Sequence, residues 1–448
     1  MAVSGSSAAS SQGGSTSSIA SGSSSGGPPR GTLAVILAGD AAGAVTSIPP
    51  GIDCPAANCQ AAFPVGTGVT LVAQTAGPGA FRQWVGTCTG SPNCGVQVVD
   101  GLTTVQAVFS VWHGNREVGV GAEGGDLNEA TGIVYANGVL HVAATLNFYQ
   151  AAIIKYSTSG DEVARTPVVK RDLTRIAVFP DGTSVIAGHD PNNSTAELIG
   201  YSGAGTILWS VPLGRQADSF TPALNQDPLG NVWVGTAVFP GGWSVFQVDA
   251  LGYVSASRGG EVGDNANRFS DFVVINPTET VIAGAAMFGG GMQRPFVQRA
   301  VFGGAAGWTY APTPTDYSVA NSVALDSLEN SYVTFDARPV ELVKFNASGQ
   351  EAWRRTIPGG VGGPGTCALQ IDLAFGFLAF SAGPSDVYAY DLDGNLLWSS
   401  PSGARVLYGV AIDDDGYVYA AGWRYEGAPT PQNKVAIVAK FDRYGNRL

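Results

Sequence analysis

Short apolar runs, separated by turn residues, recur along most of the chain. The last forty residues show the unit: apolar runs at 409–412, 417–421 and 435–441 are separated by an Asp-rich turn and a Pro-containing loop, and a final turn closes on Gly445. Runs of about four to eight residues with this composition predict β-strands. The pattern therefore predicts an all-β protein.

The same unit can be recognised seven times between Glu129 and Leu448. Each copy has a glycine four residues after an anchor position, and successive glycines are 45, 47, 52, 45, 45 and 51 residues apart. These glycines are Gly160, Gly205, Gly252, Gly304, Gly349, Gly394 and Gly445. A hairpin turn that requires positive φ explains a glycine at this place. Repeats of about 40–50 residues with four short strands predict propeller blades, so we expect a seven-bladed β-propeller.

Four copies also carry a tryptophan four residues after the glycine. These are Trp209, Trp308, Trp353 and Trp398. A side chain that repeats in register predicts packing between neighbouring blades.

The seventh copy ends three residues after its turn glycine, where the other copies begin an outermost strand. An unpaired sheet edge exposes backbone donors and acceptors. Residues 114–121, GNREVGVG, stand just before the first copy and echo the GNRL ending of the last. We therefore expect 114–121 to supply the closing strand of the last blade, and the propeller to span residues 112–448.

Two segments precede the propeller. Residues 1–31 are rich in Ser, Gly and Ala with almost no apolar content, which predicts a disordered tether. Residues 32–111 contain further strand-like runs between turns, which predict a separate small β-rich domain.

Charge narrows the range of partners. The formal net charge is −12, and no cluster of Lys and Arg is present. Binding to a phosphate backbone needs a positive field, so nucleic acid is excluded as an expected partner. No apolar run approaches the roughly 20 residues of a membrane-spanning helix.

The segment GAVTSIPPGIDCPAANCQAAFPVGTGVTLVAQ, followed by GAFRQWVGTCTG and VQAVFS, resembles a divergent internalin-type B repeat of bacterial surface proteins. This resemblance implies a small extracellular spacer or adhesive unit without catalysis. The later repeats, with AIDDDGYVYAAG and AIVAKFDRYGN as the clearest copy, look like those of bacterial secreted seven-bladed propellers of the SBBP and quinoprotein-like kind. That resemblance implies a fold and no single activity, because such propellers range from scaffolds to enzymes.

Four of the five cysteines lie in the small domain, and four cysteines allow three pairings. The resemblance implies two local disulfides, Cys54–Cys59 and Cys88–Cys94. A zinc site would need the four thiolates to converge on one ion, but the spacings are wider than in a zinc knuckle and a secreted setting favours oxidation. Cys367 remains, and we expect it to be a buried free thiol.

Residues suited to catalysis or metal binding are sparse. Of the three histidines, His113, His141 and His189, only His189 lies in a polar loop. The acidic turns at 391–395 and 413–416 have calcium-loop spacing, but equivalent turns in other copies cannot chelate, and Asp-Gly is favourable turn chemistry. We expect no catalytic residue, no metal and no cofactor.

The loops between the second and third strands of each copy differ in length and sequence. In propellers such loops crowd one face around the central channel, and exposed aromatic and Arg side chains there anchor ligands and partners. The candidate binding residues are Phe148, Tyr149, His189, Asp190, Phe239, Trp243, Arg294, Arg338, Trp423, Arg424 and Tyr425.

We therefore expect a non-catalytic binding, adhesion or scaffold module of a bacterial surface protein or lipoprotein, located outside the cell or on its outer surface. It would be monomeric and would recognise an extracellular protein or a glycan at the loop face. Contact with a membrane would require an N-terminal lipid anchor, whose acylated cysteine this sequence does not contain. The alternative is a propeller hydrolase or lyase that acts on an extracellular polymer. Two carboxylates near His189 at the channel mouth would favour that alternative.

Overall fold

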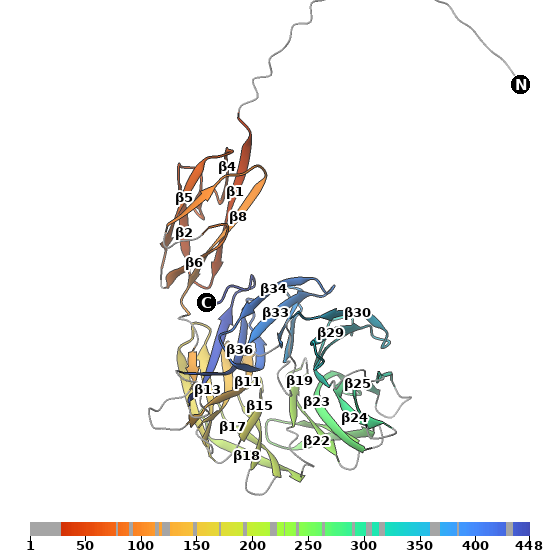
Figure 1. Ribbon diagram of the computed structural model, residues 1–448. Helices are drawn as coiled ribbons and strands as arrows, with labels where there is room; N and C mark the ends of the chain where they lie inside the picture. Colours follow the sequence, from red (N-terminus) through yellow and green to blue (C-terminus); the bar gives the residue numbers. More distant parts are fainter. Residues whose placement is uncertain are drawn as a thin grey trace, which may run out of the picture.

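The computed structural model describes most of the chain from residue 28 onward. The described ranges are 28–77, 79–88, 93–112, 116–118, 126–146, 150–169, 172–190, 195–215, 222–227, 229–238, 242–261, 265–288, 292–301, 307–312, 319–358, 368–382, 385–426 and 433–448. Within them the regular elements are β-strands (Figure 1), and these ranges contain no helix that is long and apolar enough to cross a membrane. The all-β prediction is confirmed. The tether predicted over residues 1–31 falls almost wholly outside the described residues.

Residues 30–112 form an N-terminal unit made of two four-stranded sheets. Its strands are β1 (Arg30–Gly39), β2 (Gly43–Ile48), β3 (Asp53–Cys54), β4 (Gln60–Pro64), β5 (Gly68–Thr75), β6 (Ala80–Gly86), β7 (Asn93–Gln97) and β8 (Leu102–Ser110). The sheet orders are β4-β1-β8-β6, with β1 and β8 parallel, and β3-β2-β5-β7. Alternate residues of both sheets face one shared apolar core.

The two predicted cysteine pairs of the N-terminal unit are present at disulfide-bonding separation. Cys54 is paired with Cys59, and Cys88 with Cys94, with Cα–Cα distances of 4.6 and 5.8 Å. Each pair links a β-strand to a neighbouring turn or strand. Cys367 lies outside the described residues.

Seven sheets follow one another through the rest of the chain. The first three sheets are formed by β11 (Glu129–Ala136), β12 (Val139–Leu146), β13 (Gln150–Ser157) and β14 (Glu162–Val169); by β15 (Asp172–Val178), β16 (Ser184–Asp190), β17 (Thr195–Tyr201) and β18 (Ile207–Arg215); and by β19 (Ala223–Gln226), β20 (Val232–Val238), β21 (Gly242–Val248) and β22 (Val254–Glu261). The next three sheets are formed by β23 (Asn265–Asn276), β24 (Glu279–Phe288), β25 (Met292–Val301) and β26 (Thr309–Tyr310); by β27 (Ala320–Leu325), β28 (Ser331–Phe335), β29 (Glu341–Phe345) and β30 (Glu351–Thr356); and by β31 (Leu369–Asp372), β32 (Phe377–Ala382), β33 (Asp386–Asp391) and β34 (Leu396–Pro401). The seventh sheet contains β35 (Val406–Ile412), β36 (Val418–Tyr425) and β37 (Asn433–Phe441), together with β9 (Arg116–Val118) and β10 (Asp126–Leu127).

Each of the first six sheets is an antiparallel meander in chain order. The first strands of successive sheets contact one another, from β11 through β15, β19, β23, β27 and β31 to β35, and β35 in turn contacts β11. The first strands therefore meet around one centre. Because the strands alternate in direction, the loops between second and third strands and the links between sheets lie at one end, which we call the variable-loop face. The tight turns lie at the opposite end, the tight-turn face.

The seventh sheet takes its outer strands from the segment that precedes the first sheet. β9 pairs antiparallel with β37, with Glu117 opposite Ile437, and β10 pairs parallel with the beginning of β37. The segment 114–121, which the sequence suggested as a closing strand, is thus described at 116–118 as a neighbour of β37. The segment before the first sheet and the last strands of the chain thus form one sheet.

The repeated glycine has two physical reasons in the structure. At every described copy its φ is positive, for example 83° at Gly252 and 82° at Gly445. In addition, a Cβ at Gly445 would lie 2.7 Å from the ring of Trp398 in the preceding sheet. The indole nitrogen of Trp398 donates to the carbonyl oxygen of Arg443, 3.0 Å away in the same turn.

Trp209 and Trp308 make the same contact with the turns of their following sheets, where they donate to the carbonyl oxygens of Ala250 (2.9 Å) and Ala347 (3.0 Å). The prediction that the tryptophans pack between repeats is confirmed.

The aspartates of the tight turns hold the backbone of those turns. Asp326 Oδ1 accepts the backbone N–H groups of Leu328 and Asn330, both at 2.9 Å, and Oδ2 accepts Asn330 Nδ2 and the hydroxyl of Tyr332. Asp227 and Asp413 make equivalent sets of bonds. The carboxylate oxygens of these turns are therefore used as local hydrogen-bond acceptors. Among the described residues, no group of three or more potential metal ligands is found.

A buried ion pair joins the N-terminal unit to the seventh sheet. Lys440 is 1% exposed, and its ammonium group donates to Asp40 Oδ2 at 2.6 Å and to the carbonyl oxygen of Thr158 at 2.7 Å. The ammonium also lies 4.2 Å from the ring centre of Tyr417. Removing one partner of such a pair leaves a buried charge uncompensated.

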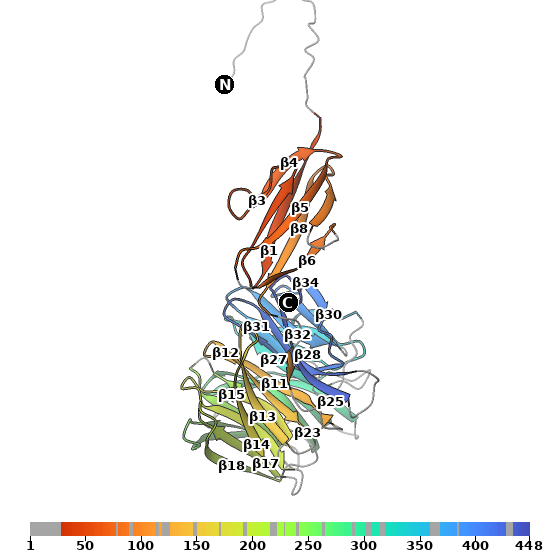
Figure 2. The ribbon, with the colours of Figure 1, turned by 90° about the vertical axis from the view of Figure 1, so that its left-hand side faces the viewer.

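Apolar contacts surround this ion pair. Ala38, Val108 and the fully buried Trp112 share one core cluster with Tyr419 and Leu448 of the seventh sheet. The N-terminal unit thus sits on the tight-turn face of the seventh sheet, beside the C-terminus (Figure 1 and Figure 2).

Two shortened chains test the role of residues 111–128. A chain that starts at Glu129 should be less stable than one that starts at Val111, by an amount on the order of 2 kcal/mol, because it loses the backbone hydrogen bonds of β9 and β10 at about 1 kcal/mol each. Both chains lack residues 1–110, so the difference isolates residues 111–128, which include the buried Trp112. Chemical denaturation followed by tryptophan fluorescence measures it. Equal midpoints would show that the segment does not support the seventh sheet.

Candidate functional site

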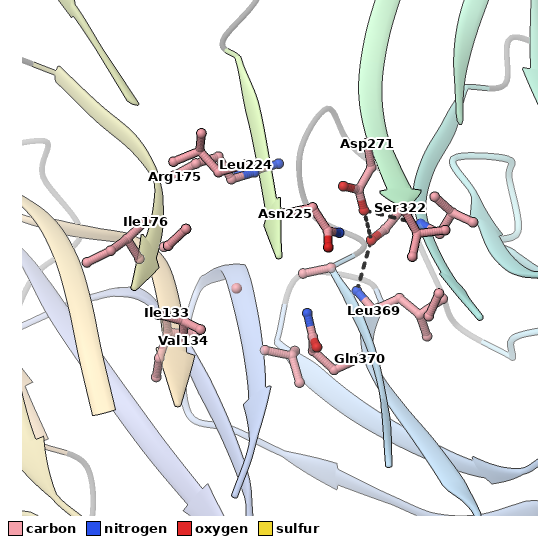
Figure 3. Close-up of a pocket in the computed structure, with 18 of the residues that line it drawn as sticks. Ile133, Val134, Arg175, Ile176, Leu224, Asn225, Asp271, Ser322, Leu369 and Gln370 are labelled. Atoms are coloured by element: carbon pink, nitrogen blue, oxygen red, sulfur yellow. Dashed lines mark hydrogen bonds between the residues drawn. The ribbon is translucent and has the colours of Figure 1, made fainter. Parts of the chain in front are cut away.

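A cavity of about 390 Å³ lies where the seven first strands meet. Its wall receives residues from β11, β15, β19, β23, β27, β31 and β35, so every sheet contributes to it. Figure 3 shows Asp271, Ser322, Asn225 and Gln370 directed toward one another from different sheets, with Ile133, Val134 and Ile176 on another part of the wall. The cavity is therefore a composite of polar and apolar groups that are distant in sequence.

Backbone bulges position the polar part of this wall. Five of the seven first strands have a bulge at the same place near the variable-loop end, at Thr131, Thr174, Ser270, Asn321 and Tyr408. The residue after each bulge lines the cavity; these are Gly132, Arg175, Asp271, Ser322 and Gly409. A bulge redirects a side chain away from the regular alternation of a strand. The bulges thus determine which residues of the first strands line the cavity.

Asp271 is held firmly in the wall. Its Oδ2 accepts the hydroxyl of Ser322 at 2.5 Å and the N–H of Val323 at 3.2 Å, and its Oδ1 accepts the N–H of Phe272 at 2.9 Å. Burial raises the pKa of Asp271, and the hydrogen bond from Ser322 and the charge of Arg175 partly oppose this. Ser322 Oγ also accepts the N–H of Leu369 from the next sheet at 3.3 Å.

Asn321 differs from its neighbours because its amide has no partner. The residue is 6% exposed, and neither Nδ2 nor Oδ1 forms a hydrogen bond within the described part of the chain. A buried polar group without a partner costs about 1–3 kcal/mol. Asn321 stands at the bulge before the cavity-lining Ser322, and both of its amide atoms are buried.

The predicted loop residues fall into four groups, the last of which consists of two buried tryptophans. Phe148, Tyr149 and Phe239 lie outside the described residues, as do the side chains of His189 and Asp190 at the end of β16. Arg338 is exposed in the loop after β28, and its charge acts on the half-buried carboxyl of Asp336. Arg294, Arg424 and Tyr425 are half-buried.

Two tryptophans of the predicted set are not exposed. Trp243 is 4% exposed and its Nε1 donates to Gln298 Oε1 at 3.2 Å, while Trp423 is 7% exposed. The ring of Trp423 meets Tyr425 edge-on at 5.0 Å, and the Lys434 ammonium lies 4.1 Å from its centre. The expectation that these two side chains form exposed anchors is corrected, because strands and not loops carry them. Trp243 packs against the next sheet, and Trp423 packs against Tyr425 and Lys434 of its own sheet.

The cavity residues were missed at the sequence level, although a signal for them exists. The segments ATGIV, LTRIA, FSDFV, ANSVA and LYGVA, at 130–134, 173–177, 269–273, 320–324 and 407–411, share a polar or aromatic residue just before the channel-facing position. Aligning the first strands of the repeats would have shown it.

Replacing Trp423 tests the packing role. Trp423→Ala should lower the free energy of unfolding by about 3 kcal/mol, because a large buried ring is removed. Arg338→Ala, at an exposed loop position, should change it by no more than about 0.5 kcal/mol. Urea denaturation of the two variants gives the comparison; a neutral Trp423→Ala would restore the binding assignment.

His141 provides a pH test of the fold. Burial lowers the pKa of His141, on β12, from 6.5 to about 4, so the folded protein prefers the neutral imidazole. The associated stability is present above pH 6.5 and is lost as the pH falls toward 4; a shift of this size corresponds to about 3 kcal/mol. His141→Leu should flatten the fall in stability between these pH values, whereas His189→Gln should keep it. Melting temperatures measured across this pH range give the comparison. If both variants show the same pH dependence, the assignment of this stability to His141 is wrong.

Neither a protein-family model nor a curated protein matches this sequence. Solved structures match in fold. BamB from Moraxella catarrhalis is 10% identical, with 73% of this chain and 98% of that chain covered and a TM-score of 0.43. Chaetomium thermophilum Raptor is 8% identical, with 72% and 28% covered and a TM-score of 0.50. The Dos1 propeller is 11% identical, with 69% and 78% covered and a TM-score of 0.45. At these identities the likeness concerns the fold alone. The fold of this chain is all-β and propeller-like because successive antiparallel sheets meet through their first strands around one centre.

Proposed function

We propose that this protein is a non-catalytic binding module, in which the seven sheets form the blades of a closed seven-bladed propeller and residues 30–112 form a separate small domain. The ligand is recognised at the variable-loop face and the cavity that opens from it. The observation that carries this proposal is the composite wall of the cavity, to which Arg175, Asn225 and Ser322 bring polar groups from three different sheets.

The wall chemistry supports binding over hydrolysis. Glycoside hydrolysis uses two carboxyl groups, one as acid and one as base or nucleophile. Among the described residues that line the cavity, Asp271 is the one carboxylate, and three donors within the wall already hold it. Because the oxygens of Asp271 already accept these hydrogen bonds, its carboxylate is poorly placed to exchange protons with a substrate.

A glycan suits the described surface better than a protein partner. Protein interfaces depend on exposed aromatic anchors such as Trp and Tyr. Trp243 and Trp423, which would serve that purpose, are buried. A concave wall of amide, hydroxyl and guanidinium groups instead offers the directional hydrogen bonds that hydroxylated ligands require. The protein partner is the alternative outcome of the binding test.

The proposed location is the bacterial cell surface or the extracellular space. Two cysteine pairs at disulfide separation in the N-terminal unit fit an oxidising compartment. The net charge of −12 fits a partner other than nucleic acid.

Paired arginine variants test which face binds. On an array of bacterial surface polysaccharides, wild-type protein should bind at least one glycan, and Arg338→Ala should weaken that binding about fivefold, equivalent to about 1 kcal/mol. Arg443→Ala, which changes an exposed arginine on the tight-turn face, should bind as wild type does. Equal loss in both variants would contradict the assignment of the face. Release of reducing sugar from the bound polysaccharide would instead support the hydrolase alternative.

A further inference from the structure

We infer that the sugar unit bound at the variable-loop end of the central cavity carries an anionic group, and that Arg175 and Arg268 hold this group. The inference rests on the proposed function and names the ligand class of the same site. It assigns ligand-contacting roles to two arginines that lie outside the variable loops, on the first strands β15 and β23.

Arg175 brings a positive charge into the cavity wall. It follows the bulge of β15, and it is the one Lys or Arg side chain among the described residues that line the cavity. The corresponding positions of the first and seventh sheets are Gly132 and Gly409, which have no side chain. No side chain from these two positions therefore separates Arg175 from the cavity.

Arg268 places a second positive charge at the mouth of the cavity. It stands before the cavity-lining Asp271 on β23, a strand that runs from the variable-loop face toward the tight-turn face. Arg268 thus lies closer to the variable-loop face than Asp271 does. The charges of Arg175 and Arg268 act on each other, although the two residues belong to different sheets. Two guanidinium groups so placed can donate to the oxygens of one carboxylate, sulfate or phosphate group.

The carboxylates of the chain do not balance the positive charge at this mouth. Among the described residues, the charges that act on one another there are those of Arg175, Arg268, Arg338, Asp271 and Asp336. Three positive groups thus face two negative groups, in a chain whose formal net charge is −12. A cleft with an excess of one sign of charge attracts ligands of the opposite sign. The local excess therefore favours an anion.

The burial of the two arginines adds to this preference. Both are half-buried, and burial disfavours a charged group. Burial lowers the pKa of Arg268; the charge of Asp336 opposes this change, and that of Arg175 adds to it. The pKa stays below its usual value, so Asp336 offsets the cost of burying this charge only in part. A ligand anion beside Arg175 and Arg268 would offset the remainder.

The size and the uncharged part of the wall suit a sugar ring that bears the anionic group. A volume of about 390 Å³ lies at the lower end of the range of roughly 300–1,000 Å³ found for small-molecule sites. Asn225 Nδ2 donates to the carbonyl oxygen of Phe272 at 2.7 Å, which directs Oδ1 away from that strand. Asn225 and Gln370 lie in the wall shown in Figure 3 and offer amide groups to the ring hydroxyls.

The test compares acidic sugars with their neutral parents in the full-length protein. Glucuronate and galacturonate carry a carboxylate, glucose 6-sulfate and glucose 6-phosphate carry the other anionic groups, and glucose and galactose are neutral. Arg175→Gln and Arg268→Gln each remove one charge and keep a polar side chain. Arg355→Gln is the matched control, because Arg355 is also half-buried but its Nε donates to the carbonyl oxygen of Gly394 at 2.7 Å in a tight turn. Isothermal titration measures binding, and thermal melting confirms that each variant is folded.

We expect at least one acidic sugar to bind wild-type protein and Arg355→Gln, and its neutral parent to bind about tenfold more weakly. Arg175→Gln and Arg268→Gln should each bind the acidic sugar about tenfold more weakly than wild type, with little change for the neutral parent. A preference for the uronates identifies the anionic group as a carboxylate, and a preference for the esters identifies it as sulfate or phosphate. If a glutamine variant does not fold, the comparison of acidic and neutral sugars on wild-type protein still decides.

Equal binding of acidic and neutral sugars, no binding of any acidic sugar, or unchanged binding in either glutamine variant overturns the inference. The proposed function fails separately. If surface polysaccharides bind in an Arg338-dependent manner while no acidic sugar depends on Arg175 or Arg268, the binding module stands and the anionic ligand is wrong. If no polysaccharide binds, the proposed function itself is wrong.

Discussion

The contact between the tryptophan of one sheet and the turn glycine of the next sets the spacing on which the rest of the ring depends. Trp398 occupies the space that a Cβ at Gly445 would fill, and its indole nitrogen is bonded to the same turn. Protein interiors are close-packed, so one added methyl group at such a contact must displace a sheet. All seven first strands meet at one cavity, and a displacement of any sheet is therefore felt in the arrangement of Asp271, Ser322 and Asn321.

An ion pair between Lys440 and Asp40, surrounded by apolar side chains, joins the N-terminal unit to this ring. A buried ion pair is a weak argument for added stability, because desolvation of both charges opposes their attraction. Its value lies in geometry: the Lys440 ammonium is satisfied only when Asp40, Thr158 and the ring of Tyr417 are all in place. Such a contact defines one relative placement of the two parts more sharply than apolar packing of Ala38 and Val108 would.

The parts of the molecule that repeat could be predicted from the sequence, and the parts that deviate from the repeat could not. The glycine and tryptophan spacings reveal the sheet units because the same backbone turn and the same contact recur in each copy. Trp243 and Trp423 were misjudged because an aromatic residue beside a variable loop looks the same whether it faces solvent or the sheet. The place of Asp271 in the cavity wall depends on a bulge and on strands of other sheets, and local pattern carries no information about which neighbours share a cavity.

The attachment of the N-terminal unit to the tight-turn face has a directional consequence. β1 begins at Arg30, far from the junction, and ends at Gly39, whose carbonyl accepts the hydroxyl of Tyr417. The unit therefore acts as a stalk with a fixed joint, and the cavity-facing bulges lie at the strand ends remote from that joint. If residues before β1 were attached to a surface, the N-terminal unit would stand between that surface and the seven sheets. The variable loops would then point away from the surface, and the length of the unit would set their distance from it. The ion pair between Lys440 and Asp40 thus also fixes the orientation of the variable-loop face relative to the N-terminal unit.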